Sequence, residues 1–181
     1  EHEANLVFTR MLSGPMDFTP GILSLKGEKD SDIPSTIAKQ LAQYVVIYSP
    51  VQMAADEPEV YAKLMDAFQF IKDVPVDWAD TRVLNGEVGD YVTIARKDRN
   101  GADWYLGAVT DESGRNLEVT LDFLDPGKTY TAQIYRDAPE TRFDSDTRHK
   151  YVIESRKVRR GDKLTLALAP GGGQAIRFAA K

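Results

Sequence analysis

Residues 117–123 (Leu-Glu-Val-Thr-Leu-Asp-Phe) and 164–168 (Leu-Thr-Leu-Ala-Leu) carry a large apolar side chain at every second position. This period of two is typical of strands that bury one face. Further short runs of β-forming residues flank them, at 91–96, 104–110, 129–135, 151–158 and 175–179. Turn signals that contain glycine separate the runs, at 85–86, 100–101, 113–114, 126–127 and 161–162. This spacing predicts an antiparallel β-sandwich over about residues 80–181.

A helical period replaces the alternation in the first 75 residues. One set of apolar positions recurs at the spacing of a helix and predicts a helix over residues 35–49. Its members are Ile37, Leu41, Tyr44, Val45 and Tyr48. A second stripe predicts a helix over 59–71. Residues 6–25 contain prolines and glycines that exclude a continuous helix, so we expect a strand end followed by a loop there.

The two halves differ in how they can bury apolar surface. Residues 80–181 supply strands for a core of their own, whereas the two helices have no strands beside them in the sequence. An amphipathic helix must be covered by a second layer. We therefore expect the first third to be the end of an α/β domain whose earlier part is not in this chain.

Composition excludes several classes of protein. The chain has 181 residues, a net charge of −5, no cysteine and two histidines. The absence of cysteine excludes disulfides, thiolate zinc sites and cysteine nucleophiles. Two histidines are too few for a metal centre with several histidine ligands. The acidic balance argues against a nucleic-acid partner. No apolar run reaches the roughly 18–20 residues that cross a bilayer, so no membrane span is expected.

Two acidic segments are candidates for chemistry. Glu1-His2-Glu3 is the densest polar cluster, and a carboxylate in it can serve as an acid, a base or a metal ligand. A solvated terminus is the alternative. Asp17 stands in an apolar segment bounded by proline and glycine, which suits the end of a barrel strand, where side chains point into an active site. Its alternative is an aspartate that caps a turn.

Three other features have simpler interpretations. The glycines at 171–173 lack the Lys-Ser/Thr of a phosphate-binding loop, so they predict a tight turn before the last strand. Trp78, Trp104 and Tyr105 could form a platform on which sugars stack, but aromatic residues at strand spacing more often belong to a core. The basic run at 156–160 lies where a hairpin is expected to end, which favours solvated surface.

A longer stretch carries more information than these motifs. Residues 1–21, Glu-His-Glu-Ala-Asn-Leu-Val-Phe-Thr-Arg-Met-Leu-Ser-Gly-Pro-Met-Asp-Phe-Thr-Pro-Gly, resemble the Glu-His…Phe-Thr-Arg…Gly-Pro-Met-Asp-Tyr/Phe-Thr-Pro-Gly segment of glycoside hydrolase family 97. The similarity continues in the same order through residues 38–42, 48–56, 68–75 and 135–137 and reaches the glycines at 171–173. That family contains α-glucosidases and α-galactosidases.

The resemblance implies an N-terminal β-sandwich, a catalytic (β/α)₈ barrel and a C-terminal β-sandwich. This chain is then expected to be an α+β fragment. Residues 1–76 form the last, mainly helical segments of the barrel, and residues 77–181 form the C-terminal sandwich. The implied partners are the missing N-terminal part of the same protein and, through the parent enzyme, an oligosaccharide substrate. The implied location is periplasmic or secreted.

The resemblance also implies a chemistry. The family uses calcium, held by glutamates beside the scissile bond, and a glutamate general acid. Glu1 stands at the glutamate of the Glu-His motif and is the candidate catalytic acid, calcium ligand or both, while Asp17 is a candidate substrate-binding residue. Glycosidases need two carboxyl groups across the bond, so we expect the chain alone to be inactive. We also expect no calcium in the fragment, because one carboxylate cannot supply the roughly six to eight oxygens that calcium takes.

This sequence departs from the family pattern at Glu3, where Asp or Thr is expected, and at Val7, where Pro is expected. The residues that separate retaining from inverting members lie upstream, so both outcomes stay open, as do glucosides and galactosides. A non-catalytic β-sandwich that binds carbohydrate or supports a neighbouring domain is the alternative function. A glycosidase origin predicts that Glu1 and Asp17 face one cleft, whereas a binding module predicts an exposed row of Trp or Tyr.

Overall fold

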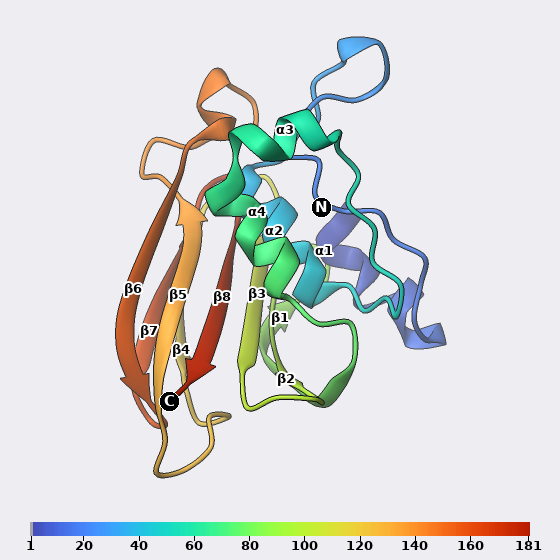
Figure 1. Cartoon of the computed structure of the whole chain (residues 1–181). Coiled ribbons are helices and arrows are strands. Elements are labelled where there is room, and N and C mark those ends of the chain that lie inside the picture. The colour runs from blue at the N-terminus through green and yellow to red at the C-terminus, as the bar shows by residue number, and fades with distance from the viewer. Residues whose placement is uncertain (1) are drawn as a thin grey trace.

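The computed structural model describes residues 2–181 as three stacked layers (Figure 1). The helices are α1 (His2–Leu6), α2 (Ile37–Val46), α3 (Pro58–Lys63) and α4 (Met65–Asp73), and short 3₁₀ turns lie at Arg10–Ser13, Glu28–Asp30 and Asp146–His149. The strands are β1 (Trp78–Glu87), β2 (Tyr91–Asp98), β3 (Trp104–Thr110), β4 (Arg115–Thr120), β5 (Thr129–Asp137), β6 (Tyr151–Arg159), β7 (Lys163–Leu168) and β8 (Gly173–Ala180). They form a six-stranded sheet, in the order β1-β2-β3-β8-β5-β6, and a two-stranded sheet of β4 and β7. The predicted antiparallel sandwich is confirmed.

The six-stranded sheet is buried on both faces at its centre. In β3, Leu106 and Ala108 belong to the core shared with the two-stranded sheet. The alternate positions Tyr105 and Val109 belong to a second core, shared with the helices. Because successive side chains of a strand point to opposite faces, β3 separates two cores and is buried along its whole length.

Helix α2 fills the space on the helical side of the sheet. It begins after Thr36, whose hydroxyl accepts a hydrogen bond from the Lys39 amide at 3.2 Å, and all ten of its residues are buried. It lies against β3 and β8. The expectation that the helices have no sheet to cover is therefore wrong. Helix α2 packs on the apolar residues of this face of β2 and β3. The sequence of the helical segment or of the sandwich, taken alone, does not reveal this contact.

Several predicted boundaries also need correction. The helix predicted over 59–71 breaks at Leu64, where φ and ψ leave the helical range, and so forms α3 and α4. Asn85-Gly86 lies inside β1 at a shift of strand register, and the hairpin turn follows at 88–90. Residues 6–8 end a helix rather than a strand.

Strand β4 ends at Thr120, although the alternation of apolar residues continues to Phe123. The extra apolar residues still serve the core, because Leu121 is fully buried in the loop that follows β4. The alternation of apolar residues therefore predicted correctly that Leu121 is buried, but it placed the end of the strand too late.

A short parallel pairing precedes the antiparallel sheets. Phe18 and Gln52 form a parallel β-bridge, and α2 lies between them in the sequence. Parallel neighbours need a crossover connection, so this part of the chain is a small β-α-β unit. The division of the chain at residue 76 stays a prediction. Within residues 2–181, every helix is too short to pass through a lipid bilayer.

Candidate functional site

The polar cluster nearest to the start of the chain joins α1 to α2. The Lys39 ammonium lies 2.9 Å from Glu3 Oε2 and donates to the carbonyl oxygen of Thr110 at 3.1 Å. Gln43, one turn further along α2, donates through Nε2 to Glu3 Oε1. The Lys39 side chain is only 4% exposed, against 32% for Glu3. Both oxygens of Glu3 are thus held by residues of α2.

A cavity of about 250 Å³ lies beside this cluster. One wall consists of His2, Glu3 and Lys39, from α1 and α2. Phe143 and Gly171, from loops of the sandwich, also line it. The sandwich and the helical layer therefore share a cavity at the end of the chain where the sequence places the Glu-His motif.

Asp137, at the end of β5, lies buried behind the cluster. Its Oδ2 accepts hydrogen bonds from the amides of Gly173 at 2.9 Å and Ala169 at 3.2 Å. Burial raises the pKa of Asp137 to about 6, and the side chain of Thr36, the two amides and the charge of Lys39 act in the opposite direction. Its Oδ1 has no hydrogen-bond partner among the described residues. The carboxyl of Asp137 therefore keeps its proton to a higher pH in the fold than an exposed aspartate does.

The glycines at 171–173 form the predicted tight turn, and close contacts explain why no side chain fits. A Cβ on Gly172 would lie 2.0 Å from Asp137 Oδ2, and one on Gly171, whose φ is +67°, would lie 2.5 Å from Phe143. A Cβ on Gly173 would lie 2.7 Å from Lys39 Cα. The turn therefore fits closely around Asp137 and α2.

Of the two acidic candidates, Asp17 and Glu1, the structure describes only Asp17. Asp17 is exposed, immediately before the bridge residue Phe18, and its side chain makes no hydrogen bond or ion pair with any of the described residues. Glu1 lies outside the described residues. Its roles as acid and calcium ligand, and the shared cleft with Asp17, stay predictions.

Calcium does not fit the residues that the structure describes. Nowhere in residues 2–181 do three or more His, Asp or Glu side chains gather as a metal site would require. Glu3, the acidic residue nearest to Glu1 in the sequence, is already paired with Lys39 and Gln43. Calcium prefers about six to eight oxygen ligands. A calcium site in a longer protein would have to draw its ligands mainly from outside these residues.

The aromatic platform is absent from residues 2–181. Trp78, Trp104 and Tyr105 are 7%, 2% and 2% exposed, so they belong to the core, as their spacing predicted. No other Trp or Tyr in this part of the chain is exposed. The pattern expected of a carbohydrate-binding module is therefore missing.

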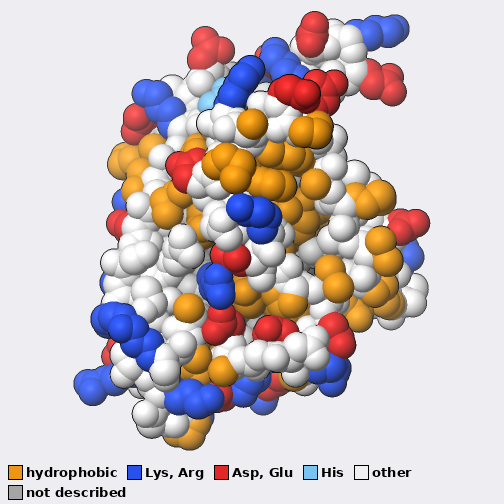
Figure 2. All heavy atoms as spheres, in the orientation of Figure 1, with side chains coloured by type: hydrophobic (Ala, Val, Ile, Leu, Met, Phe, Trp, Pro, Cys, Tyr) orange, Lys and Arg blue, Asp and Glu red, His pale blue; other side chains and the backbone are white. Residues whose placement is uncertain are grey.

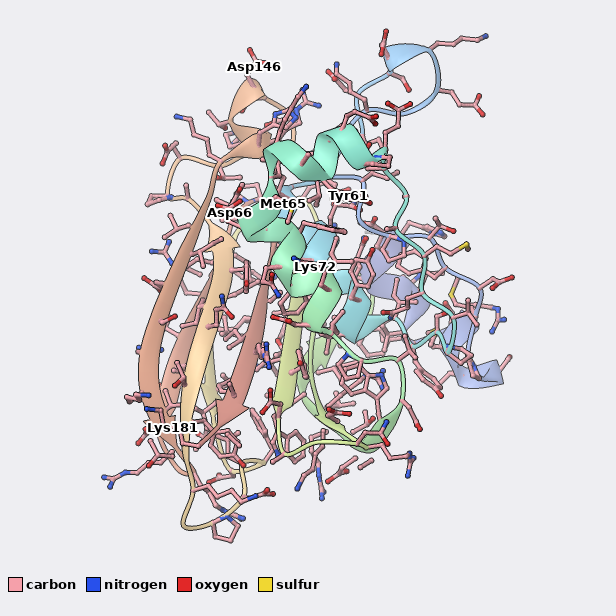
Figure 3. The ribbon with its side chains drawn as sticks, viewed as in Figure 1. Tyr61, Met65, Asp66, Lys72, Asp146 and Lys181 are labelled. Atoms are coloured by element: carbon pink, nitrogen blue, oxygen red, sulfur yellow. The ribbon has the colours of Figure 1, made fainter. Side chains whose placement is uncertain are left out.

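Apolar side chains are instead exposed on the helical side (Figure 2). Tyr61, Met65 and Phe68 line an apolar cavity of about 380 Å³ on α3 and α4 (Figure 3). Leu12 and Val51 are 79% and 62% exposed near the two segments that form the parallel bridge.

Arg96, on β2, is a second buried cation in contact with α2, and the sequence analysis missed it. Its guanidinium donates to the carbonyl oxygens of Val45 at 2.6 Å and Val46 at 3.4 Å, at the C-terminal end of the helix, and to Thr81 Oγ1 at 2.9 Å. Burial lowers its pKa to about 10. Lys39 thus lies in the first turn of α2, and Arg96 contacts the C-terminal end of the same helix.

The sequence signals for these two cations are weak. Lys39 and Gln43 are four residues apart in a predicted helix, which places them on one face. That spacing does not reveal that the face of the helix carrying Lys39 and Gln43 is buried. Nothing in the sequence near Arg96 indicates a contact with a helix end.

Comparisons with known proteins identify relatives along the whole chain. The family model described as "Glycosyl-hydrolase 97 C-terminal, oligomerisation" matches residues 77–179. A glycoside hydrolase family 97 enzyme from Pseudoalteromonas sp. strain K8, solved in complex with panose and with acarbose, is 52% identical with a TM-score of 0.95. The match covers 99% of this chain and 28% of that one. A retaining alpha-galactosidase from Bacteroides thetaiotaomicron is 35% identical over 98% of this chain and 27% of its own length. This chain thus spans little more than a quarter of the length of these relatives.

Proposed function

Because this chain belongs to glycoside hydrolase family 97, we propose that it is the C-terminal part of a glycosidase that cleaves α-linked glucosides. The observation that carries this proposal is the 52% identity, over 99% of the chain, to a family member solved with panose and acarbose. Panose is an oligosaccharide of α-linked glucose. The 35% identity to a retaining alpha-galactosidase supports α-galactosides as the second candidate substrate class.

We propose that residues 1–76 complete the catalytic barrel of that enzyme. The parallel bridge between Phe18 and Gln52, with α2 between them, supports this, because the barrel is built from such β-α-β units. The exposed Leu12 and Val51 are then contacts with the missing part of the same protein. Active sites of such barrels lie at the C-terminal ends of the strands. Asp17, exposed beside the bridge residue Phe18 and unpaired among the described residues, is proposed to bind substrate because the resemblance to the family implies it.

Glu1 is proposed as the general acid, which protonates the oxygen of the leaving sugar. The second carboxyl group that the reaction needs would come from outside this chain, and so would most ligands of any calcium ion. The chain alone is therefore proposed to be inactive. The sandwich, residues 77–179, is proposed to help the parent enzyme associate with further copies, in line with the description of its family model.

The experiment uses the whole parent enzyme and its Glu1→Gln variant. We expect wild type to hydrolyse aryl α-glucosides faster than aryl α-galactosides. Loss of acid catalysis typically costs about 10²–10⁴-fold, so Glu1→Gln should lose that much kcat on substrates with poor leaving groups. It should lose much less on substrates whose acidic aryl group leaves without protonation.

The matched control is Glu140→Gln, an exposed carboxylate paired with Lys150 on the sandwich, which should behave as wild type. A parent enzyme that cleaves only galactosides would move the proposal to the second substrate class. A Glu1→Gln variant with normal kcat on every substrate would remove Glu1 from the mechanism. An equal loss on all substrates, together with lost calcium binding, would make Glu1 a metal ligand.

A further inference from the structure

Residues 77–179, all of which the structure describes, leave two large apolar side chains exposed. They are Val83, on β1, and Val88, in the turn that follows β1, and they are 64% and 65% exposed. A single exposed apolar side chain is ordinary on a protein surface. These two lie on one hairpin, however, so the exposed apolar surface of the sandwich is concentrated at one edge.

Strand β1 is an edge strand of the six-stranded sheet, and within residues 2–181 no strand pairs with its outer side. It is exposed along most of its length, whereas β3 at the centre is buried throughout. Its pairing with β2 shifts in register between Trp78 and Asp80 and again between Val83 and Asn85. Such irregularities bend an edge and oppose the addition of another strand. A partner at this edge is therefore held by side chains rather than by a continued sheet.

A cavity of about 710 Å³ opens beside β1. Residues of β1 line it, among them Arg82 and Leu84, together with residues of β4 and the loop after it, among them Glu118 and Phe123. The second sheet has only two strands within the described residues, and two strands cannot cover the whole face of a six-stranded sheet. The sandwich is thus open beside β1, and the half-buried side chains of Leu84 and Phe123 border the opening.

Charge distinguishes the two edges of the six-stranded sheet. The other edge strand, β6, exposes Arg156, Lys157 and Arg159, so two copies that met there would bring like charges together. Strand β1 carries charges of both signs, since Arg82 pairs with Asp80 at 2.8 Å. The β1 edge can therefore face a copy of itself without a net repulsion between like charges.

We infer that the β1 edge and the cavity beside it form the surface through which two copies of the parent enzyme associate. The inference rests on the association proposed for the sandwich, whose family model is described by oligomerisation. A two-fold axis brings the same patch of both copies together, so each copy covers Val83 and Val88 of the other. Leu12 and Val51, which are also exposed, lie outside the residues that this family model matches.

Sedimentation equilibrium of the whole parent enzyme, over a range of protein concentrations, tests the inference. The variants Val83→Asp and Val88→Asp each place a charge in the inferred contact. The matched control is Ser155→Asp, which adds the same charge at an exposed position of the other edge strand, β6. Circular dichroism reports whether each variant folds, and the midpoint of thermal unfolding is recorded for each.

We expect wild type to form a dimer. Val83→Asp and Val88→Asp should each raise the dissociation constant of the dimer about 10-fold or more, because the contact would bury a charge without a partner. Ser155→Asp should associate as wild type does. If Val83→Asp does not fold, Val88→Asp carries the test, because it lies in a turn outside the paired strands.

Two results would overturn this surface but leave the association proposed for the sandwich in place. In one, wild type associates and both aspartate variants associate equally well. In the other, Val83→Asp lowers the unfolding midpoint without changing the dissociation constant, which would assign the β1 edge to contacts with the missing part of the same protein. A wild-type parent that is a monomer at every concentration would overturn both the inference and the proposed association.

Discussion

Arg96 and Asp137 are buried, although arginine and aspartate side chains usually lie on the protein surface. Arg96 meets the carbonyl oxygens at the end of α2, where the helix dipole favours a cation. Asp137 meets backbone amides at the turn before β8. Each satisfies backbone groups that would otherwise be buried without partners.

Replacing Arg96 by Met should destabilise the chain. The change leaves the carbonyl oxygens of Val45 and Val46 without their donor, and an unpaired buried polar group costs about 1–3 kcal/mol. Arg96→Lys, the control, keeps a charge but loses the planar fork and should cost less. Urea unfolding of the 181-residue chain, followed by fluorescence of the buried Trp78 and Trp104, measures both. A loss below about 0.5 kcal/mol for Arg96→Met would contradict the capping role.

Replacing Asp137 by Asn should change how stability depends on pH. The pKa of Asp137 is about 6 in the folded chain against an ordinary value of 3.8, so the unfolded chain loses this proton first as the pH rises. The carboxyl therefore lowers the free energy of unfolding progressively between about pH 4 and pH 6, by about 2–3 kcal/mol in all. An asparagine has no such proton, yet its amide oxygen can still accept from Gly173 and Ala169.

Urea unfolding of both proteins at a series of pH values measures this difference. The free energy of unfolding of Asp137→Asn, relative to that of wild type, should rise from pH 4 to pH 6 and stay level above that. Other carboxyl groups titrate alike in the two proteins, so they cancel. Parallel pH curves would show that folding does not raise the pKa of Asp137.

At the scale of elements, α2 lies so close to the sheet that glycine is required beneath it. A Cβ on Gly107 of β3 would lie 2.5 Å from the carbonyl oxygen of Ala42 and 2.9 Å from a methyl group of Val46. The neighbouring strand β8 contributes Gly173 in the same way. Two glycines on adjacent strands thus allow the backbone of α2 to pack closely against the sheet.

Gly107→Ala should lift α2 from the sheet. Overpacking of this kind costs about 1–3 kcal/mol, and hydrogen exchange at the α2 amides should accelerate. The control is Gly127→Ala, whose Cβ meets nothing within 4 Å and whose φ of +76° costs backbone strain alone. The control should leave exchange in α2 unchanged relative to its global stability. Unchanged protection of α2 in Gly107→Ala would contradict the close contact.

The sequence predicted the type of most elements because their patterns are local. The spacing of apolar residues located α2, and a run of β-forming residues between turn signals located β3, whose bounds are the predicted 104–110. It did not locate the break at Leu64 or the shift of strand register between Val83 and Asn85, and no local pattern in the sequence marks either one. The ion pair of Lys39 with Glu3 and the contact of Arg96 with α2 are likewise made between segments far apart in the sequence.

At the scale of the whole molecule, the helical layer and the six-stranded sheet share one of the two cores, and loops of the sandwich also reach the helical segment. Arg148 pairs with Asp32 at 3.0 Å, and the imidazole of His149 lies 3.1 Å from the carbonyl oxygen of Ser24. Amino-acid composition excluded several classes of protein, but it could not predict these contacts between the sandwich and the helical segment. The sequence similarity indicated the family because many residues in one order are far more specific than any single motif.

We propose that this chain supplies the acid side of an active site whose remainder lies elsewhere in a glycoside hydrolase family 97 enzyme. The most direct measurement is hydrolysis of an aryl α-glucoside, and of the corresponding α-galactoside, by four preparations. These are the whole parent enzyme, the parent ending before Glu1, the 181-residue chain, and the two pieces produced together in one cell. We predict activity in the whole enzyme and in the paired pieces, and none in either piece alone. Turnover by the 181-residue chain alone, or full activity in the parent that ends before Glu1, would contradict this proposal.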